Sequence, residues 1–304
     1  FKYYFSKFRI IKMLDYKIIE KNRCQLGEAP IWHRNNKSFY WLDYIDNNFF
    51  KYNTVSEEVE FIKLSLETPL GGLVQFDQFN KFLIGAVNGI FLFDFDKNNS
   101  KLFLDPEEGN KNIIYNDLKI DNSKRLWVGT SHKDEKLPEG SLWCINRDLS
   151  YKRIDTNFIV SNGPAFSKDG KNIYFSDSFN RTIYKYNNSK NLDLIKSEKF
   201  YEFKQEDGFP DGLTVDDNGN IWVAHWNGGK ISQISSSGKL LKEIKLPSMN
   251  ITSLCFGGDS FKELFITSAK EEVSESDFKK FPESGSSFLI SPDSIGYESE
   301  IWES

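Results

Sequence analysis

Leu126-Trp127-Val128-Gly129-Thr130 is one of six copies of a phrase in which apolar and aromatic residues lead into small or polar ones. The other five are Phe39-Tyr40-Trp41-Leu42-Asp43, Phe82-Leu83-Ile84-Gly85-Ala86, Ile173-Tyr174-Phe175-Ser176-Asp177, Ile221-Trp222-Val223-Ala224-His225 and Leu264-Phe265-Ile266-Thr267-Ser268. Their second residues stand at 40, 83, 127, 174, 222 and 265, so the steps are 43, 44, 47, 48 and 43 residues. A strand-rich repeat of about 40–50 residues is typical of propeller blades. The sequence therefore predicts an all-β, six-bladed β-propeller with a central channel.

Each repeat has the same internal order. An inner segment is followed by a turn rich in Asp, Asn, Lys and Gly, then by the aromatic strand and a third strand. The inner segments are Gly27–Trp32, Leu70–Gln75, Asn116–Asp121, Asn162–Ser167, Asp211–Asp216 and Thr252–Gly257. We expect most of the aromatic side chains to fill the space between adjacent blades.

The length of 304 residues suits one domain, because a propeller grows by adding blades around its channel. We predict a single propeller domain over residues 14–304. Residues 1–13 are predicted to be an N-terminal extension, either disordered or upstream of the natural start, for which Met13 is a candidate. Tyr16–Glu20 is predicted to form the outer edge of the last blade, so that the two chain ends close the ring and protect the strand edges.

Composition excludes several classes of partner. The net charge is a mild −5 and no Lys/Arg-rich patch stands out, which argues against nucleic acid. No apolar run reaches membrane-spanning length. Cys24, Cys144 and Cys255 are widely spaced and odd in number, which argues against a disulfide framework and favours buried thiols in a reducing, cytoplasmic setting. We expect a monomer or a weak homodimer.

Polar residues recur at one position of the inner segments. The segments can be aligned on their core residues Ile31, Val74, Ile120, Phe166, Val215 and Phe256. Four positions earlier stand Gly27, Leu70, Asn116, Asn162, Asp211 and Thr252. Because all inner strands run the same way along the channel, equivalent residues should form a ring near one mouth.

Three of the six ring residues are Asn or Asp, and the acidic residues Glu28 and Asp117 stand one position after the ring. Five oxygen-bearing side chains from four blades are thus predicted to meet at one end of the channel: Glu28, Asn116, Asp117, Asn162 and Asp211. Carboxylates combined with amide oxygens suit a hard divalent cation such as Ca²⁺, Mg²⁺ or Mn²⁺. The alternative interpretation is that these residues only cap turns at the starts of strands. We favour a metal site, because turn capping does not require all five to converge.

The three histidines offer little support for a covalent mechanism. His33 follows an inner strand and is expected on the surface, His132 lies in a loop beside the predicted cavity, and His225 is expected to pack at a blade edge. The chain also has no Gly-x-Ser-x-Gly nucleophile elbow.

The sequence resembles the SMP-30/gluconolactonase/LRE-like family of lactonases over residues from about 14 to the end. The resemblance is carried by five motifs in family order: Leu26-Gly27-Glu28-Ala29-Pro30-Ile31-Trp32, Asn116-Asp117 running through Asp121 to Arg125-Leu126-Trp127-Val128-Gly129-Thr130, Ser161-Asn162-Gly163-Pro164, Phe209-Pro210-Asp211-Gly212-Leu213 running on to Asn227-Gly228-Gly229, and Thr252-Ser253-Leu254-Cys255-Phe256-Gly257-Gly258.

The resemblance implies a six-bladed propeller that hydrolyses a sugar lactone to its aldonic acid with one divalent ion (Ca, Mg, Mn, Zn or Fe, with Ca expected in a crystal). It places the metal ligands on Glu28, Asn162 and Asp211 and a substrate-positioning residue on Asn116. Asp117 stands beside Asn116 as a further substrate-binding candidate. An acidic lid residue falls on Asp134.

Two departures from the family pattern concern the substrate. Ile114 stands where regucalcin-like members carry an Arg, and Leu118 stands where a Gly is usual. Loss of the Arg removes a planar donor fork that would clamp hydroxyl or carboxylate groups.

The mechanism implied is attack of water on a lactone carbonyl that the cation polarises. Asp211 is the predicted general base and Asp117 the alternative base.

Two other functions stay open at this point. One is a propeller esterase of paraoxonase-like specificity, toward which Leu70, Ile114 and Leu118 lean because they are apolar. The other is a non-catalytic, Ca-binding propeller, because a fold alone does not settle function.

Overall fold

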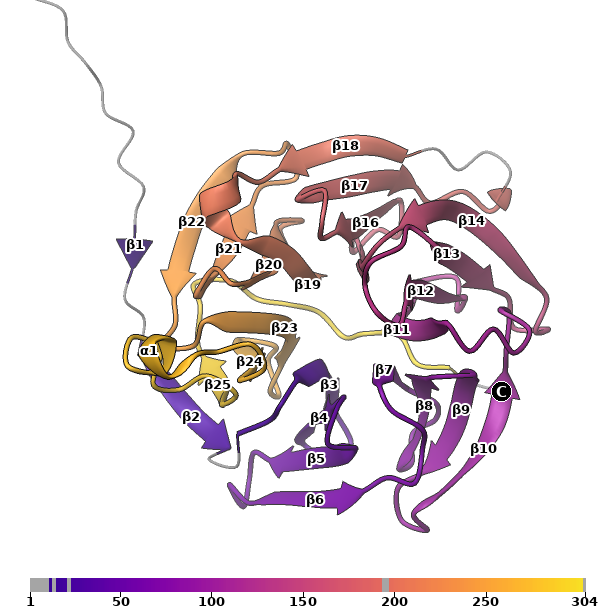
Figure 1. Ribbon diagram of the computed structural model, residues 1–304, viewed down its shortest axis with the longest axis horizontal. Helices are drawn as coiled ribbons and strands as arrows, with labels where there is room; N and C mark the ends of the chain where they lie inside the picture. Colours follow the sequence, from indigo (N-terminus) through magenta and orange to yellow (C-terminus); the bar gives the residue numbers. More distant parts are fainter. Residues whose placement is uncertain (1–10, 13–14, 21–22, 193–196, 303–304) are drawn as a thin grey trace, which may run out of the picture.

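The computed structural model describes residues 11–12, 15–20, 23–192 and 197–302, and it is an all-β ring of six sheets around a channel (Figure 1). The predicted fold is confirmed. Blade 1 contains β3 (Gly27–His33), β4 (Ser38–Asp43), β5 (Asn48–Asn53) and β6 (Val59–Lys63). Blade 2 contains β7 (Leu70–Gln75), β8 (Lys81–Ala86), β9 (Gly89–Asp94) and β10 (Asn99–Leu104). Blade 3 contains β11 (Ile113–Ile120), β12 (Leu126–His132), β13 (Gly140–Ile145) and β14 (Tyr151–Phe158).

The second half of the ring repeats this order. Blade 4 contains β15 (Ser161–Phe166), β16 (Asn172–Asp177), β17 (Thr182–Asn187) and β18 (Ser197–Glu202). Blade 5 contains β19 (Phe209–Val215), β20 (Ile221–Trp226), β21 (Lys230–Ile234) and β22 (Leu240–Lys245). Blade 6 takes β23 (Asn250–Gly257), β24 (Glu263–Ala269) and β25 (Ser287–Ile290) from the end of the chain, with the short helix α1 (Glu275–Phe278) before β25.

The fourth strand of blade 6 comes from the start of the chain. Strand β2 (Tyr16–Glu20) pairs antiparallel with β25, with Tyr16 opposite Ile290 and Ile18 opposite Phe288. The sheet order β2-β25-β24-β23 therefore joins the two ends of the polypeptide in one blade, as the sequence predicted. The ring is closed by backbone hydrogen bonds between segments about 270 residues apart.

The predicted N-terminal extension is only partly described. Strand β1 (Ile11–Lys12) lies parallel to β22 and adds a fifth strand to blade 5. Residues 1–10 and 13–14, and with them the predicted boundary after Met13, lie outside the described residues.

Aromatic side chains fill the interfaces between blades, as expected. Tyr40 of blade 1 contacts Phe82 of blade 2 with ring centroids 4.9 Å apart. At the other face of blade 1, the ring centroid of Trp41 lies 5.0 Å from that of Phe265 of blade 6. All four of these side chains are fully buried. The recurring aromatic phrase thus supplies the packing that holds neighbouring blades at a fixed angle.

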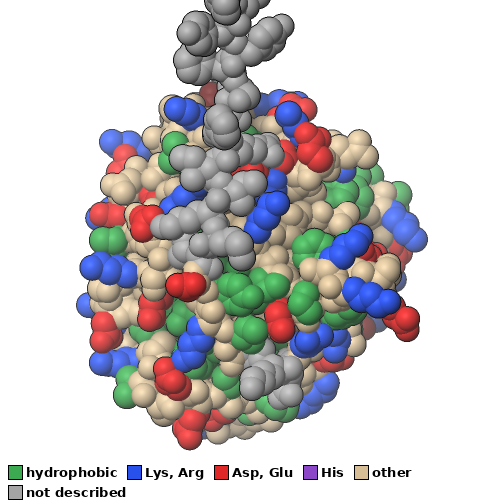
Figure 2. Space-filling view, turned by 90° about the vertical axis from the view of Figure 1, so that its left-hand side faces the viewer, with side chains coloured by type: hydrophobic (Ala, Val, Ile, Leu, Met, Phe, Trp, Pro, Cys, Tyr) green, Lys and Arg blue, Asp and Glu red, His purple; other side chains and the backbone are tan. Residues whose placement is uncertain are grey.

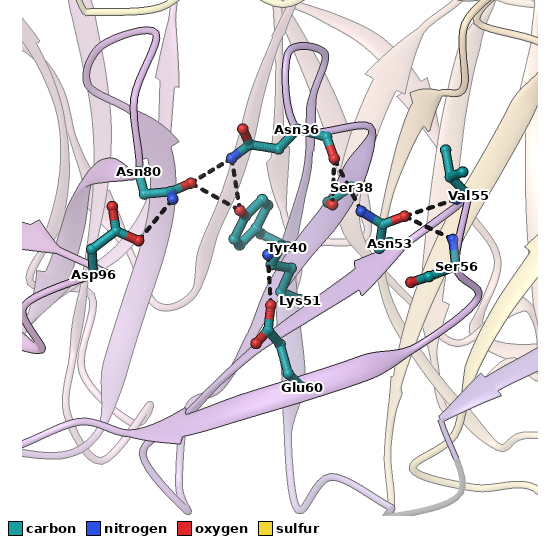
Figure 3. Close-up of polar contacts among 10 residues, drawn as sticks. All are labelled: Asn36, Ser38, Tyr40, Lys51, Asn53, Val55, Ser56, Glu60, Asn80 and Asp96. Carbon is teal, nitrogen blue, oxygen red and sulfur yellow. Dashed lines mark hydrogen bonds and ion pairs between the residues drawn. The ribbon is translucent and has the colours of Figure 1, made fainter.

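A polar network joins blades 1 and 2 near the turns between their first and second strands (Figure 3). The Asn36 amide donates to the Tyr40 hydroxyl at 3.0 Å, and that hydroxyl donates to Asn80 Oδ1 at 3.1 Å. Asn80 in turn donates to Asp96 at 2.8 Å. The buried phenol therefore has its polar partners, and burial raises its pKa above the ordinary range.

Buried aspartates anchor the turns before two aromatic strands. Asp216 accepts the indole N–H of Trp222 at 3.0 Å and the Gln233 amide at 2.9 Å, besides two backbone N–H groups of its own turn. Asp121 accepts the indole N–H of Trp127 at 2.9 Å in the equivalent place of blade 3. Each carboxylate ties a turn to the tryptophan that packs the blade.

After β25, the described chain continues as a tail, residues 291–302, that crosses the centre of the ring (Figure 1). The Ile295 carbonyl accepts from Asp217 N at 2.7 Å, and Trp302 N donates to the Gln75 carbonyl at 2.9 Å. The Trp302 side chain is buried against blades 2 and 3. Tail residues 297–301 line a small cavity of about 90 Å³ with the last residues of the inner strands. The tail thus covers the end of the channel where the inner strands finish.

His33 is not on the surface, and that expectation was wrong. Its side chain is fully buried, its Nε2 lies 3.0 Å from the Phe79 carbonyl, and its ring packs beside Tyr40 and Phe82. Strand β3 continues to residue 33, so His33 belongs to the blade interface. His225 is fully buried, as expected, with Nε2 2.8 Å from Ser232 Oγ.

Three further observations bear on the expected surroundings of the protein. All three cysteines are buried, as predicted. Among the described residues, no helix is long and apolar enough to cross a bilayer. On the face shown in Figure 2, acidic and basic side chains are interspersed among apolar ones.

Replacement of Asp216 by Asn should lower the free energy of unfolding by about 2–4 kcal/mol, since Trp222 and Gln233 would then donate to a neutral amide in a buried place. Urea denaturation measures this loss. The matched control is Asp217→Asn, whose side chain pairs at the surface with Lys168 and should cost less than about 1 kcal/mol. Equal losses in the two variants would contradict the anchoring role.

Because His225 is buried in its neutral form, the free energy of unfolding should fall in mild acid. Burial, reinforced by the Lys230 ammonium, lowers the pKa of His225 to about 3, whereas an unfolded histidine titrates near about 6.5. Its stabilisation is complete above that unfolded value and shrinks by up to about 1.4 kcal/mol per pH unit below it, because only the unfolded chain takes up the proton.

The measurement is urea denaturation of wild type and His225→Gln at pH 7, 6 and 5. The stability difference between wild type and variant should shift by about 2 kcal/mol against the wild type from pH 7 to pH 5. A difference that stays constant over this range would show that the folded protein protonates His225 normally.

Candidate functional site

A cavity of about 440 Å³ opens at the end of the channel where the inner strands begin. Glu28 of β3, Asn116 of β11, Asn162 of β15 and Asp211 of β19 line it, and each is at most 9% exposed. Four of the five side chains that the repeat alignment placed in one ring therefore do meet around one space. The ring positions Gly27, Leu70 and Thr252 are not part of the cavity wall.

A bulge in every inner strand explains how these side chains reach the channel. The pairing with the second strand shifts between Glu28 and Ile31 in β3, and between Asn162 and Ala165 in β15. The other four inner strands shift register at the equivalent place: Leu70/Leu73, Tyr115/Asp117, Pro210/Leu213 and Ile251/Leu254. A bulge breaks the alternation of a strand and re-aims its side chains. The site is therefore built on the irregular part of each blade.

The two asparagines are held by hydrogen bonds to each other and to blade 4. Asn116 Nδ2 donates to the Ser161 carbonyl at 2.7 Å and to Asn162 Oδ1 at 3.0 Å. Asn162 Nδ2 donates to Ser178 Oγ at 3.0 Å. Tyr44 of blade 1 donates its hydroxyl to the Asn116 carbonyl at 3.0 Å, so the Asn116 backbone is fixed as well. Both amides are thus oriented before any ligand binds.

The carboxyl groups of the cavity floor are buried close to one another. Burial, together with the Asp117 carboxylate, raises the pKa of Glu28 to about 8. Burial also raises the pKa of Asp211 well above its usual range, and the charges of Glu28 and Asp117 add to the effect. Negative charge accumulates here at a cost, which a bound cation would relieve.

Asp117 does not line the cavity. It is buried, and its carboxylate accepts the N–H of Leu118 and the N–H of Gly163, both at 2.9 Å. The bond from Gly163 ties β11 of blade 3 to β15 of blade 4. The structure therefore places Asp117 in the wall between two blades, beside the side chains that face the cavity.

Apolar side chains cover much of the remaining cavity wall. Ile114, the residue in place of the family arginine, is among them, with Val160, Phe179, Phe209 and Trp226. Leu70 and Leu118, the other two apolar residues noted in the sequence, lie in the core between blades and not at the cavity. An apolar wall thus faces a polar floor.

The mouth of the cavity carries acidic residues from two loops. Asp134, the residue predicted as an acidic lid residue, lines it from the loop after β12. Glu135 from the same loop, and Glu271 and Glu272 from the loop after β24, line it too. Sequence reasoning missed these three because they lie outside the repeated strands. Their clustering could be found only once blades 3 and 6 were placed across one mouth.

A divalent cation fits the donors on the cavity floor. Within the described part of the chain, no group of three or more His, Cys, Asp or Glu side chains is arranged to hold a metal. The two carboxylates Glu28 and Asp211 would therefore need the amide oxygen of Asn162 as third ligand. Asn162 Oδ1 accepts one hydrogen bond and keeps a second lone pair for this purpose. Such an all-oxygen set suits a hard ion.

Comparison with known proteins agrees with the fold and the motifs. The family described as "SMP-30/Gluconolactonase/LRE-like region" matches residues 26–270. An uncharacterised protein of Sulfolobus acidocaldarius is 32% identical over 83% of this chain and 90% of its own. The pentonolactonase XacC of Haloferax volcanii is 28% identical over 81% of this chain and 82% of its own. The crystal structure of a calcium-binding protein, regucalcin, from Agrobacterium tumefaciens has a TM-score of 0.90 at 21% identity, covering 96% of this chain and 98% of that one.

Gly71 should be essential to the position of Asn116. A Cβ on Gly71 would lie 1.6 Å from the Tyr115 carbonyl oxygen, so any side chain there forces β7 away from β11. We expect Gly71→Ala to lose about 3 kcal/mol or more of unfolding free energy, measured by urea denaturation. Gly109→Ala is the control, because its Cβ meets nothing within 4 Å and only its positive φ of 79° adds strain, about 1 kcal/mol. Similar losses in both variants would refute the close-packing argument.

Proposed function

Because the chain belongs to the SMP-30/gluconolactonase/LRE-like family, we propose that it is a lactonase that hydrolyses a sugar lactone to the aldonic acid. The observation that carries this proposal is the meeting of Glu28, Asn162, Asp211 and Asn116 around one cavity. Its volume of about 440 Å³ lies within the usual range for ligand sites, about 300–1,000 Å³. The relative named as a pentonolactonase supports the reaction class.

Glu28, Asn162 and Asp211 would hold one divalent ion. When bound, such an ion supplies Lewis-acid polarisation of the lactone carbonyl and charge stabilisation for the tetrahedral oxyanion. The all-oxygen donor set favours Ca²⁺, Mg²⁺ or Mn²⁺ over softer ions, and we propose Ca²⁺ as the first candidate.

Asp211 is our candidate for the general base. Its carboxylate lines the cavity and can accept a proton as the water oxygen bonds to the carbonyl carbon. The acyl carbon–ring oxygen bond then breaks, and the ring oxygen takes a proton to become the hydroxyl of the acid. Lactone and water are thereby converted into one hydroxy acid.

Asn116 would position the substrate. Its amide nitrogen is already committed to Ser161 and Asn162, which leaves the amide oxygen to accept a bond from a sugar hydroxyl. Asp134, at the cavity mouth, can accept a second hydroxyl. Asp117 is assigned a positioning role rather than a substrate contact, because its carboxylate bonds to the backbone between blades.

The apolar wall favours one second candidate, an esterase acting on less polar esters. Ile114, Phe179 and Trp226 face the same cavity as the polar floor and would suit an alkyl or aryl group. We therefore include an aryl acetate beside the sugar lactones in the test below. The three widely spaced, buried cysteines also lead us to place the protein in a reducing compartment such as the cytoplasm.

The decisive experiment is acid release from a panel of pentono- and hexono-lactones and phenyl acetate. Metal-stripped protein, protein restored with Ca²⁺, Mg²⁺ or Mn²⁺, and Asp211→Asn are compared. We expect lactone hydrolysis that is abolished by EDTA, restored by a divalent ion, and reduced at least about 100-fold in the variant. Calorimetric titration of the stripped protein with each ion gives a readout that does not depend on activity.

Asp148→Asn is the matched control, since Asp148 is exposed and, among the described residues, its carboxylate bonds to Ser150 of its own turn. It should match wild type in both assays. Preferred hydrolysis of phenyl acetate would support the esterase instead. Tight metal binding without turnover of any ester would reject both enzymes and leave a Ca-binding propeller.

A further inference from the structure

The cavity has a marked excess of acidic groups. Six carboxyl groups line it, those of Glu28, Asp134, Glu135, Asp211, Glu271 and Glu272, against the single ammonium of Lys133. One divalent ion on the floor would leave this excess in place. The excess is concentrated at the mouth, through which a substrate must pass.

Three of these groups face one another across the mouth. Glu135 lies in the loop after β12 of blade 3, and Glu271 and Glu272 lie in the loop after β24 of blade 6. Both loops reach the same cavity, so residues from two separate blades meet there. Burial and the charges of Glu271 and Glu272 raise the pKa of Glu135. In the described residues none of the three forms an ion pair with a lysine or arginine. We call these three residues the acidic rim.

Backbone hydrogen bonds hold the rim in place. Glu271 N donates to the Gln25 carbonyl at 3.1 Å, and Asn250 Nδ2 donates to the Glu271 carbonyl at 2.8 Å. Glu135 N donates to the His132 carbonyl at 2.8 Å. These bonds fix the backbone positions from which the Glu135 and Glu271 side chains extend.

We propose that Glu135, Glu271 and Glu272 determine specificity by excluding anions, so that the cavity admits uncharged lactones, rejects lactones that carry a carboxylate or phosphate, and expels its acid product. This inference rests on the proposed lactonase function for its substrates. Its physical basis is repulsion at the mouth, where low-dielectric walls strengthen the field of fixed charges. Hydrolysis turns a neutral lactone into an anion, so the same rim that ignores the substrate repels the product.

The first test compares two lactones with the same ring size. Galactono-1,4-lactone is uncharged, whereas glucaro-1,4-lactone carries a free carboxylate at neutral pH. In the triple variant Glu135→Gln, Glu271→Gln, Glu272→Gln, kcat/KM for the anionic lactone should rise about tenfold at low salt. The value for the neutral lactone should stay within about twofold. The gain should shrink as NaCl is raised toward 0.5 M, because salt screens the rim.

The control triple is Glu58→Gln, Glu108→Gln, Glu275→Gln. These glutamates are exposed and do not line the cavity, and both triples change the net charge from −5 to −2. The control should leave the ratio of the two kcat/KM values unchanged. An equal rise in the control would show an effect of net charge alone, and no rise in either would overturn the proposal.

A second test needs no turnover and separates failure of the rim from failure of the lactonase proposal. Trp226 lines the cavity and is the partly exposed member of the seven tryptophans, the other six being buried. Its fluorescence, obtained as the difference between protein with and without Trp226→Phe, is quenched with iodide or with neutral acrylamide at constant ionic strength. The rim triple should raise iodide quenching about two- to threefold and leave acrylamide quenching unchanged. Unchanged iodide quenching would overturn anion exclusion, whatever the enzyme hydrolyses.

Discussion

The structure depends on the pairing of β2 with β25, which joins residues near the start of the chain to residues near its end. Without this pairing, blade 6 would have three strands, all from the end of the chain, and no backbone hydrogen bonds would join the two ends of the ring there. The pairing completes a four-stranded blade 6 from both ends of the chain and so holds the ring of six blades closed. The convergence of Glu28, Asn162 and Asp211 on one cavity follows from that closure.

Regular strands alone would not produce the site. A regular inner strand alternates its side chains between two neighbouring blades, and the six bulges interrupt this alternation at the same height in the ring. The close approach of Gly71 to Tyr115 and the bonds from Asn116 to blade 4 then lock the irregular segments. Function is placed where the repeat departs from ideal geometry, while the repeat supplies rigidity.

Much of the fold could be read from the sequence because the aromatic phrase recurs at a blade-sized interval and Tyr16–Glu20 has a strand pattern. Alignment of the inner segments also brought Glu28, Asn116, Asn162 and Asp211 together. The orientation of Asp117 could not be predicted, since it depends on a register shift at Tyr115/Asp117. The acidic rim lies in loops that are not part of the repeat, so the repeat could not predict it. Burial of His33 depends on contacts with the neighbouring blade, which the sequence around His33 does not reveal.

The tail, residues 291–302, determines from which end of the ring a ligand can reach the cavity. A propeller channel is in principle a tunnel, but residues 297–301 and the last residues of the inner strands close one end around a space of only about 90 Å³. Among the described residues, the tail therefore blocks the route from this end of the ring to the cavity of about 440 Å³ at the other end. A ligand of that cavity would enter and leave on the side of the loops after β12 and β24.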